Sequence, residues 1–365
     1  MTVFVMLMVC VAAALAWAGH ELAIYQSYYP AEIDIRMVMP EEAPAQIQQG
    51  KIQAYIGAVR SSAPMGAVET LGSFVVLDIN PQSSLAESAC AVTASVINDL
   101  AGRGSGFVFH PYPVTPFQGD YLYHADLAEQ AKRRWSGSEG IARLVVKAAG
   151  GSVSALVRRD WLAPGPEWDA SLSEIDADAL VAGAMTAVNG WLGPPWLRTG
   201  WFLADLLLTD GLTEPAARER LAGDLARLET GDWDGAVERI NLERDLVGLL
   251  TGGCRRSVVG YTVKRNYFSD DYSAGIENIG YDAVSGFRSP MFVRTAKLKD
   301  FPWNGWLGIG IDGRPDAAWN PIAGFTDPFG RLLWFALGDP ALMPAPNDFG
   351  WSINRVADVR EAPAP

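Results

Sequence analysis

The chain has 365 residues, enough for a sizeable hydrophobic core and for two lobes. Hydrophobic residues make up 49% of the chain and charged residues 19%, a balance that excludes an intrinsically disordered protein. Asp and Glu outnumber Lys and Arg by 42 to 29, and the resulting net charge of −13 argues against nucleic acid and anionic lipid as partners.

The N-terminus carries the first predicted element. Residues 2–18 contain no charge and read TVFVMLMVCVAAALAWA. A run of this length is typical of a secretory signal or of a short membrane anchor, so we predict one of these for residues 1–18. Ala16-Trp17-Ala18 is an A-x-A cleavage signal that would leave Gly19 at the mature N-terminus, whereas the usual positive n-region is missing. Both alternatives place the body of the chain outside the cytoplasm, in the periplasm or an equivalent compartment.

Residues 19–160 alternate between strand-like and helix-like segments. Strands are predicted at residues 21–28, 33–39, 51–59, 70–79 and 105–109. Helices are predicted at residues 40–50, 84–102 and 122–135. Residues 141–148 and 152–158 are predicted to form a strand pair across a Gly-Gly turn. This alternation predicts an α/β lobe with a largely parallel or mixed sheet.

One part of this lobe is similar to a known family. Residues 48–57 read QQGKIQAYIG, a helix that ends in Gly followed by a strand. With the order of elements over residues 21–59, this segment resembles the opening of type-2 periplasmic solute-binding proteins. In that family the strand after such a helix lines the ligand cleft. The resemblance therefore implies two lobes, a bound solute and a ligand contact at Tyr55.

The character of the chain changes twice after this lobe. Residues 161–168 (WLAPGPEW) predict a linker, and residues 169–252 predict a helical lobe. After Gly252-Gly253 the chain becomes strand-like again, at residues 257–268 and 291–297. We predict that residues 253–298 return to the first sheet, and that residues 299–365, rich in Trp, Pro and Gly, form an irregular wrapping segment. The predicted fold class is therefore two-lobed α/β with a mixed sheet.

Two cysteines lie beyond the N-terminal segment, Cys90 and Cys254. In an oxidising compartment they can form one disulfide across a very long loop. The alternative is two separate buried thiols, which the apolar helix predicted around Cys90 favours.

Two of the three histidines fall in the segment HPYPVTPFQGDYLYHAD, residues 110–126. His110, Asp120, His124 and Asp126 supply imidazoles and carboxylates, which suit zinc or copper. Asp120 and His124 are four residues apart, so one helix face can present both. The alternative is structural: Asp120 as a helix N-cap, His110 at the end of a strand and His124 on a solvated helix face.

Aromatic residues on loops rich in Pro and Gly are efficient anchors for a ligand or a partner. The candidate contacts to a ligand or partner are Tyr55, Tyr112, Phe117, Trp303, Trp306 and Trp319. No Gly-rich phosphate loop, HExxH or GxSxG motif occurs in the sequence, which lowers the expectation of an enzyme.

Three function classes follow from these observations. The first is an extracytoplasmic, non-catalytic solute-binding protein that takes a small molecule between its lobes. The second is an accessory subunit docked on a membrane protein complex through the aromatic C-terminal segment. The third is a metal-dependent enzyme that uses His110 and His124. We predict the binding or accessory role rather than catalysis.

Overall fold

The computed structural model describes residues 30–59, 61–102, 107–135, 141, 143–187, 193–301, 305–315, 327–337, 341–345 and 350–353. The predicted signal or anchor at residues 1–18 and the candidate contacts Trp303 and Trp319 lie outside this part of the chain. Within it, no helix is both long enough and apolar enough to cross a bilayer.

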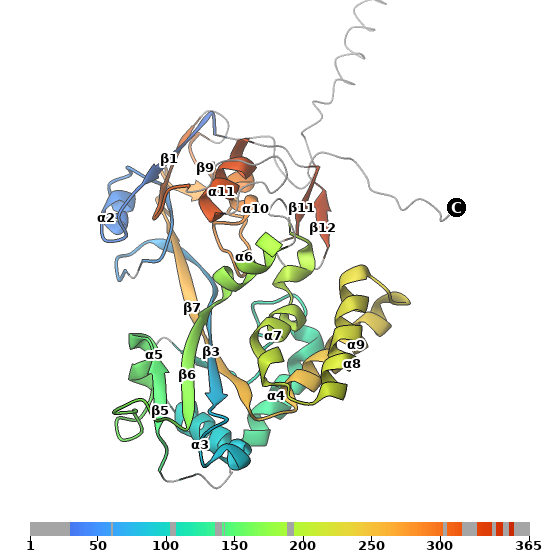
Figure 1. Ribbon diagram of the computed structural model, residues 1–365. Helices are drawn as coiled ribbons and strands as arrows, with labels where there is room; N and C mark the ends of the chain where they lie inside the picture. The colour runs from blue at the N-terminus through green and yellow to red at the C-terminus, as the bar shows by residue number, and fades with distance from the viewer. Residues whose placement is uncertain are drawn as a thin grey trace, which may run out of the picture.

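A mixed sheet forms the centre of the protein, with strand order β1-β10-β2-β7-β3-β6-β5 and with β4 paired to β7 (Figure 1). Its strands are β1 (Glu32–Met37), β2 (Ala54–Ile56), β3 (Gly66–Ile79), β4 (Val108–Phe109), β5 (Val146–Ala149), β6 (Ala170–Asp176), β7 (Arg256–Phe268) and β10 (Trp306–Ile311). The pairs β1–β10, β10–β2 and β5–β6 are parallel, and the other pairs are antiparallel. Two small sheets pair β8 (Ile276–Glu277) with β9 (Lys297–Leu298) and β11 (Leu342–Pro344) with β12 (Trp351–Ile353).

Two long strands connect the two halves of this sheet. β3 and β7 are 14 and 13 residues long and are rich in β-branched and aromatic residues, which favour extended backbone. β6 pairs with β3 only from Ser73 onward, and β2 pairs with β7 only at Ala54 and Phe268. Between these points, residues 67–71 of β3 pair with residues 263–267 of β7 as a two-stranded ribbon. We call this ribbon the waist.

The half of the sheet that contains β5 and β6 is covered on both faces. Leu71, Phe74 and Val76 of β3 point to a cluster shared with α4 and α6–α9, while Val75 and Leu77 point to a cluster shared with α3 and α5. From Phe74 onward this alternation is what the period of two along a strand requires, and Leu71 lies before the register shift between β3 and β7. The helices are α3 (Ala89–Ala101), α4 (Tyr121–Trp135), α5 (Gly151–Leu156), α6 (Ala177–Ala187), α7 (Gly200–Leu208), α8 (Pro215–Thr230) and α9 (Gly235–Thr251).

The other half of the sheet has two smaller clusters of its own. One face packs β2 and β10 against α10 (Pro290–Thr295) and α11 (Pro328–Leu337), and the opposite face packs Tyr55 and Tyr267 against α2 (Ala43–Gln48). Figure 1 shows β3 and β7 running from the part with α2, α10 and α11 to the part with α3, α4 and α7–α9. The core is therefore divided into clusters on either side of the waist.

The mixed α/β class predicted from the sequence is confirmed, and β7 returns to the first sheet as expected. The structure differs in the segment predicted to be irregular, because β10 inserts as a parallel strand between β1 and β2. Its buried residues Leu307, Ile309 and Ile311 alternate with small glycines, and a side chain at Gly310 would collide with Ile52. The alternation of a strand was thus present in the sequence of β10. The segments that β10 contacts lie far earlier in the chain: the Gly308 amide, for example, donates a hydrogen bond to the Gln53 side chain, 255 residues away.

Three local predictions were wrong. Residues 152–158 do not form a strand, because residues 151–156 form α5. Residues 291–297 are mostly the helix α10, which starts at Pro290 and is capped by the Ser289 hydroxyl. The helix predicted at residues 84–102 starts later than expected, since α3 begins at Ala89 without a side-chain cap.

The predicted linker at residues 161–168 packs on the sheet. Trp161 is buried, its carbonyl accepts a hydrogen bond of 2.6 Å from the Val146 amide, and the Ala163 amide donates back to Val146 at 2.9 Å. The helical block that follows shares its hydrophobic cluster with β3 and β7. It therefore covers one face of the sheet, and the division between the halves of the protein falls at the waist.

Candidate solute site

The histidines of residues 110–126 are buried side chains with internal partners. His110 Nε2 donates a hydrogen bond of 2.8 Å to the Val114 carbonyl, and burial lowers the pKa of His110. The Tyr112 hydroxyl lies 2.9 Å from His124 Nδ1. Burial, with a smaller effect of the Arg244 charge, lowers the pKa of His124 to about 4. Both rings are therefore neutral at pH 7 and form part of the packing beneath α4.

The two aspartates of this segment have different roles. Asp120 is fully buried and accepts hydrogen bonds from the Gly200 and Trp201 amides at 2.9 and 3.1 Å. It thus satisfies the first amides of α7, a helix 80 residues away in the sequence. Asp126 accepts two hydrogen bonds from Arg244, at 2.7 and 2.8 Å, and these lower the pKa of its carboxyl to about 2.

The four residues predicted to bind a metal are therefore held by other partners. In the described part of the chain no three His, Cys, Asp or Glu side chains gather in a way that could hold a metal ion. Zinc or copper at His110, Asp120, His124 and Asp126 stays a prediction that these contacts do not support.

The predicted aromatic contacts are mostly interior residues. Tyr55 is fully buried and its hydroxyl donates to the Val38 carbonyl, so it faces α2 and not a solute. Tyr112 is also buried, and Phe117 packs edge-to-face on Tyr261 with ring centroids 5.8 Å apart. Among the candidate contacts that the structure describes, Trp306 at the start of β10 presents a large surface, with 75% of the residue exposed.

A groove of about 750 Å³ lies along the waist. We call it the waist groove, and its walls are Ala58, Val59, Ser61, Glu69, Gly72, Ser73, Phe107, Val108, Glu174, Asp176, Thr262, Val263, Lys264, Arg265 and Tyr267. These residues come from both halves of the sheet and from the ribbon that joins them. The volume is in the range of small-molecule sites, about 300–1,000 Å³.

The walls of the waist groove carry charges of both signs. Glu69 and Arg265 face each other across the ribbon and form an ion pair of 2.8 Å. Asp176 accepts a hydrogen bond of 2.7 Å from the Ala179 amide at the start of α6. Glu174 adds a further carboxylate, and Lys264 adds a half-buried ammonium on the middle of β7. The groove is therefore more polar than the cleft with aromatic walls that the sequence predicted.

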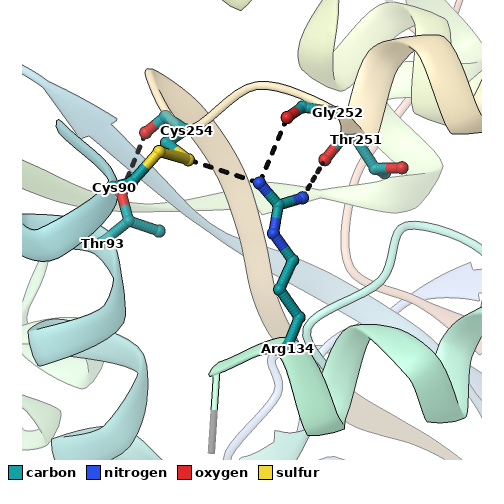
Figure 2. The surroundings of a disulfide bond; sticks show 6 residues. All are labelled: Cys90, Thr93, Arg134, Thr251, Gly252 and Cys254. Carbon is teal, nitrogen blue, oxygen red and sulfur yellow. Dashed lines mark hydrogen bonds between the residues drawn. A yellow bond between two sulfur atoms is a disulfide. The ribbon is translucent and has the colours of Figure 1, made fainter. Parts of the chain in front are cut away.

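A second cavity, of about 330 Å³, lies within one half of the protein between α4, α9 and the start of β7. Tyr112 and Arg134 are part of its wall. Arg134 donates hydrogen bonds to the carbonyls of Thr251 and Gly252, at 2.9 and 3.1 Å, beside the disulfide (Figure 2). This cavity is enclosed by elements that share one hydrophobic cluster, so motion between the halves would not open it.

The sequence reasoning did not select the residues of the waist groove. One signal was available: β7 reads RSVVGYTVKRNYF, and in its middle Thr262, Lys264 and Arg265 interrupt the apolar residues of the strand. Such an interruption indicates that the middle of the strand is accessible to solvent. It does not say which other segments lie beside it.

The scan against protein-family models finds no match, and the search of curated proteins also finds none. Among solved structures, the chain is similar to the periplasmic murein tripeptide binding protein MppA, with 11% identity and a TM-score of 0.39, over 71% of this chain and 55% of that one. It is also similar to the oligopeptide-binding protein AppA from Bacillus subtilis in complex with a nonapeptide, with 11% identity and a TM-score of 0.37, over 71% and 58%. A third is NikZ from Campylobacter jejuni in complex with Ni(L-His), with 12% identity and a TM-score of 0.33, over 66% and 56%.

The chain spans little more than half the length of these structures. At TM-scores below 0.5 the likeness assigns neither a fold family nor a ligand. The class of the protein is therefore stated from its own geometry: a mixed α/β protein with two halves that are joined by a two-stranded ribbon beside a polar groove.

Proposed function

We propose that this chain is an extracytoplasmic, non-catalytic protein that binds a small polar solute in the waist groove. The observation that carries the proposal is the position of the groove. It lies beside the two-stranded ribbon that joins the halves of the sheet, and its walls come from both halves. A small rotation about this ribbon would change the width of the groove, which is how a hinge couples closure to binding.

The charges of the groove indicate the kind of solute. Its walls hold the carboxylates Glu69, Glu174 and Asp176 and the cations Lys264 and Arg265. The Glu69–Arg265 ion pair accounts for one charge of each sign. A zwitterion such as an amino acid or a short peptide offers an ammonium to Asp176 and a carboxylate to Lys264. We therefore propose a small zwitterionic solute.

The disulfide supports the proposed compartment. The sequence allowed either a bridge between Cys90 and Cys254 or two separate thiols, and the structure has the bridge. Disulfides persist in oxidising compartments such as the periplasm and are rare in the cytosol. This agrees with the signal or anchor predicted at residues 1–18, where cleavage and anchoring remain predictions.

Thermal shift measurements on the purified chain test the proposal. The probes are the twenty L-amino acids and a set of di- and tripeptides, each added at millimolar concentration. We expect one group of zwitterions to raise Tm in a saturable way, because a ligand that binds only the folded state stabilises it. Isothermal titration of the best probe then gives its Kd.

Two matched variants connect the binding to the groove. Lys264→Met removes the ammonium from the groove wall, whereas Lys147→Met removes an exposed ammonium from β5, outside the groove. We expect Lys264→Met to weaken binding by about 10-fold or more, the effect of a lost charged hydrogen bond, and Lys147→Met to leave Kd unchanged. Equal affinities for both variants would rule out the groove as the site.

The accessory role has one observation in its favour. Phe301 and Trp306 are 64% and 75% exposed, and the Gly305 amide, next to Trp306, donates a hydrogen bond of 3.0 Å to the Phe301 carbonyl. Exposed aromatic residues of this size are typical anchors at protein interfaces. If the protein is a subunit of a membrane complex, native purification will retain partner proteins that are lost from Trp306→Ala while the Tm of the chain itself stays the same.

A further inference from the structure

A small pocket with three arginines in its wall lies away from the waist groove. It is lined by Asp178, Val181, Ala182, Gly193, Arg198, Ser285, Arg288, Pro290, Pro328, Arg331 and Pro344. These residues belong to α6, the short helix Pro195–Arg198 and Gly193 just before it, the loop before α10, and α10, α11 and β11. None of them lines the waist groove. We call this the arginine pocket.

The arginines come from three separate segments and are largely withdrawn from solvent. The Arg331 residue is 6% exposed, and the side chains of Arg198 and Arg288 are 13% and 20% exposed. A guanidinium stays charged at physiological pH, so three of them in one wall repel each other and have lost much of their hydration. Burial lowers the pKa of Arg331, and the charge of Arg198 acts in the same direction.

Asp282 and Asp178 form short ion pairs with Arg198 and Arg288. Arg198 Nε lies 2.6 Å from Asp282 Oδ2, and Arg288 Nη1 donates a hydrogen bond of 2.6 Å to Asp178 Oδ2. Asp312 is more distant, at 3.7 Å from Arg288 Nη2. Asp327 and Asp178 act on Arg331 through their charges. The wall of the pocket itself contains three guanidiniums and only one carboxylate, that of Asp178.

Some of the donors of these arginines have no acceptor. Arg198 Nη1 and Arg288 Nε are buried and have no hydrogen-bond partner in the described structure. A buried charged donor without an acceptor is destabilising unless another group supplies one. The pocket volume of about 40 Å³ is larger than the roughly 10–15 Å³ that one water needs, and it suits a halide ion or a single carboxylate group.

We propose that the arginine pocket binds a small monovalent anion, a halide or a carboxylate group, which joins the Pro195–Arg198 helix, the loop before α10 and α11 through Arg198, Arg288 and Arg331. An anion there accepts hydrogen bonds from guanidiniums of three segments at once. Its binding therefore stabilises the contact between the helical block and the C-terminal elements. The proposal is independent of the solute proposed for the waist groove.

The experiment measures Tm of the full, disulfide-bonded chain at constant ionic strength while methanesulfonate is replaced by chloride, formate or acetate. Methanesulfonate has no carboxylate group and is bulkier than the other three anions, so it serves as the reference anion. At about ten times the half-saturating concentration we expect Tm to rise by about 2–4 °C, with saturation rather than a continuing salt effect. Arg331→Met should lose the saturable rise, and Arg158→Met, which removes an exposed arginine paired with Asp160, should keep it.

The three anions distinguish the source of the ligand. A rise with chloride as well as formate supports a free small anion, and a rise with formate and acetate alone supports the carboxylate group of a larger molecule. Line broadening of the chloride-35 NMR signal, or saturation transfer from formate protons, by wild type but not by Arg331→Met confirms direct binding. No saturable rise with any of the three anions overturns the proposal, as does an unchanged rise in a folded Arg331→Met variant. If that variant does not fold, the wild-type titration and NMR decide alone.

Discussion

Two carboxylates, those of Asp120 and Glu243, are buried together in the helical half of the protein. Burial raises the pKa of Asp120 to about 6 and that of Glu243 to about 7, and the charge of Asp120 adds to the shift of Glu243. Arg239 lies 3.1 Å from Glu243 Oε1 and only partly offsets the burial, while Glu243 Oε2 has no hydrogen-bond partner in the described structure. At neutral pH the folded protein therefore carries the cost of ionising these groups.

The first prediction concerns this cost at Glu243. The ordinary pKa of 4.5 applies to the unfolded chain and a pKa of about 7 to the folded one. The folded state binds the proton more tightly, so the glutamate lowers stability progressively as pH rises from about 4.5 to 7 and by a constant amount above that range. Glu243→Gln removes this effect. Urea titrations measure the difference in the free energy of unfolding between the variant and wild type. We expect this difference to increase in favour of the variant by about 2 kcal/mol from pH 5 to pH 8.

The control for this prediction lies on the same helix. The pKa of Glu238 is lowered, first by a hydrogen bond from the Asp234 amide and then by Arg227. Glu238→Gln should therefore lose stability relative to wild type as pH rises, the opposite direction. Because His110 and His124 are present in all three proteins, their titration cancels in the differences. If the difference in unfolding free energy between Glu243→Gln and wild type does not change with pH, the pKa of Glu243 is not raised in the folded protein.

At the level of elements, the waist depends on an irregularity in β3. The register between β3 and β7 shifts between Leu71 and Phe74, and the Ser73 amide donates a hydrogen bond of 2.9 Å to Thr262 Oγ1. A Cβ atom on Gly72 would lie 2.7 Å from Thr262 Oγ1 and 3.0 Å from its carbonyl oxygen. Only glycine allows the two strands to approach this closely, so the bulge fixes the shape of the ribbon.

The second prediction tests this approach. Gly72→Ala must push the two strands apart, and we expect it to lower the free energy of unfolding by about 1–3 kcal/mol, as overpacking does. Since Gly72 also lines the waist groove, the substitution should weaken the binding of any solute found there. Gly165→Ala is the matched control, because a Cβ at Gly165 meets no atom within 4 Å. Equal urea midpoints for the two variants would contradict the role of the bulge.

At the scale of the whole molecule, the disulfide connects two segments that are far apart in the sequence and lie in the same half of the protein. Cys90 lies in α3 and Cys254 immediately before β7, with a sequence separation of 164 residues. The Thr93 hydroxyl donates a hydrogen bond of 2.9 Å to the Cys254 carbonyl, and Arg134 Nη2 lies 3.4 Å from Cys254 Sγ. Figure 2 shows α3, α4 and the end of α9 meeting at this point. The bridge therefore holds the start of the long strand β7 to α3.

The third prediction follows from the length of the closed loop. In the unfolded chain a bridge over so many residues removes much conformational freedom, so its loss should cost about 2–5 kcal/mol of stability. We expect the double variant Cys90→Ala, Cys254→Ala to show this loss in urea titrations. A reducing agent should lower the stability of wild type by a similar amount and leave the variant unchanged. Identical midpoints for oxidised wild type and the variant would exclude a stabilising role for the bridge.

Several features of this protein could be predicted from short stretches of sequence. The helical character within residues 169–252 depends on local signals, and α8 is an example, with Pro215 at its first position and Gly231 in the left-handed conformation after its last turn. The long strands β3 and β7 followed from their β-branched and aromatic residues. These signals act within a few residues, so each is complete in its own segment. The mixed α/β class is the sum of such local preferences.

The tertiary structure alone decided the sites. Asp120 looked like the cap of its own helix or a metal ligand, and it caps α7 instead, 80 residues away. Tyr55 looked like a residue of the cleft and is buried against α2. The waist groove and the arginine pocket are built from segments that are far apart in the chain. Which of those segments meet depends on the packing of the whole core, and no preference of a few neighbouring residues contains that information.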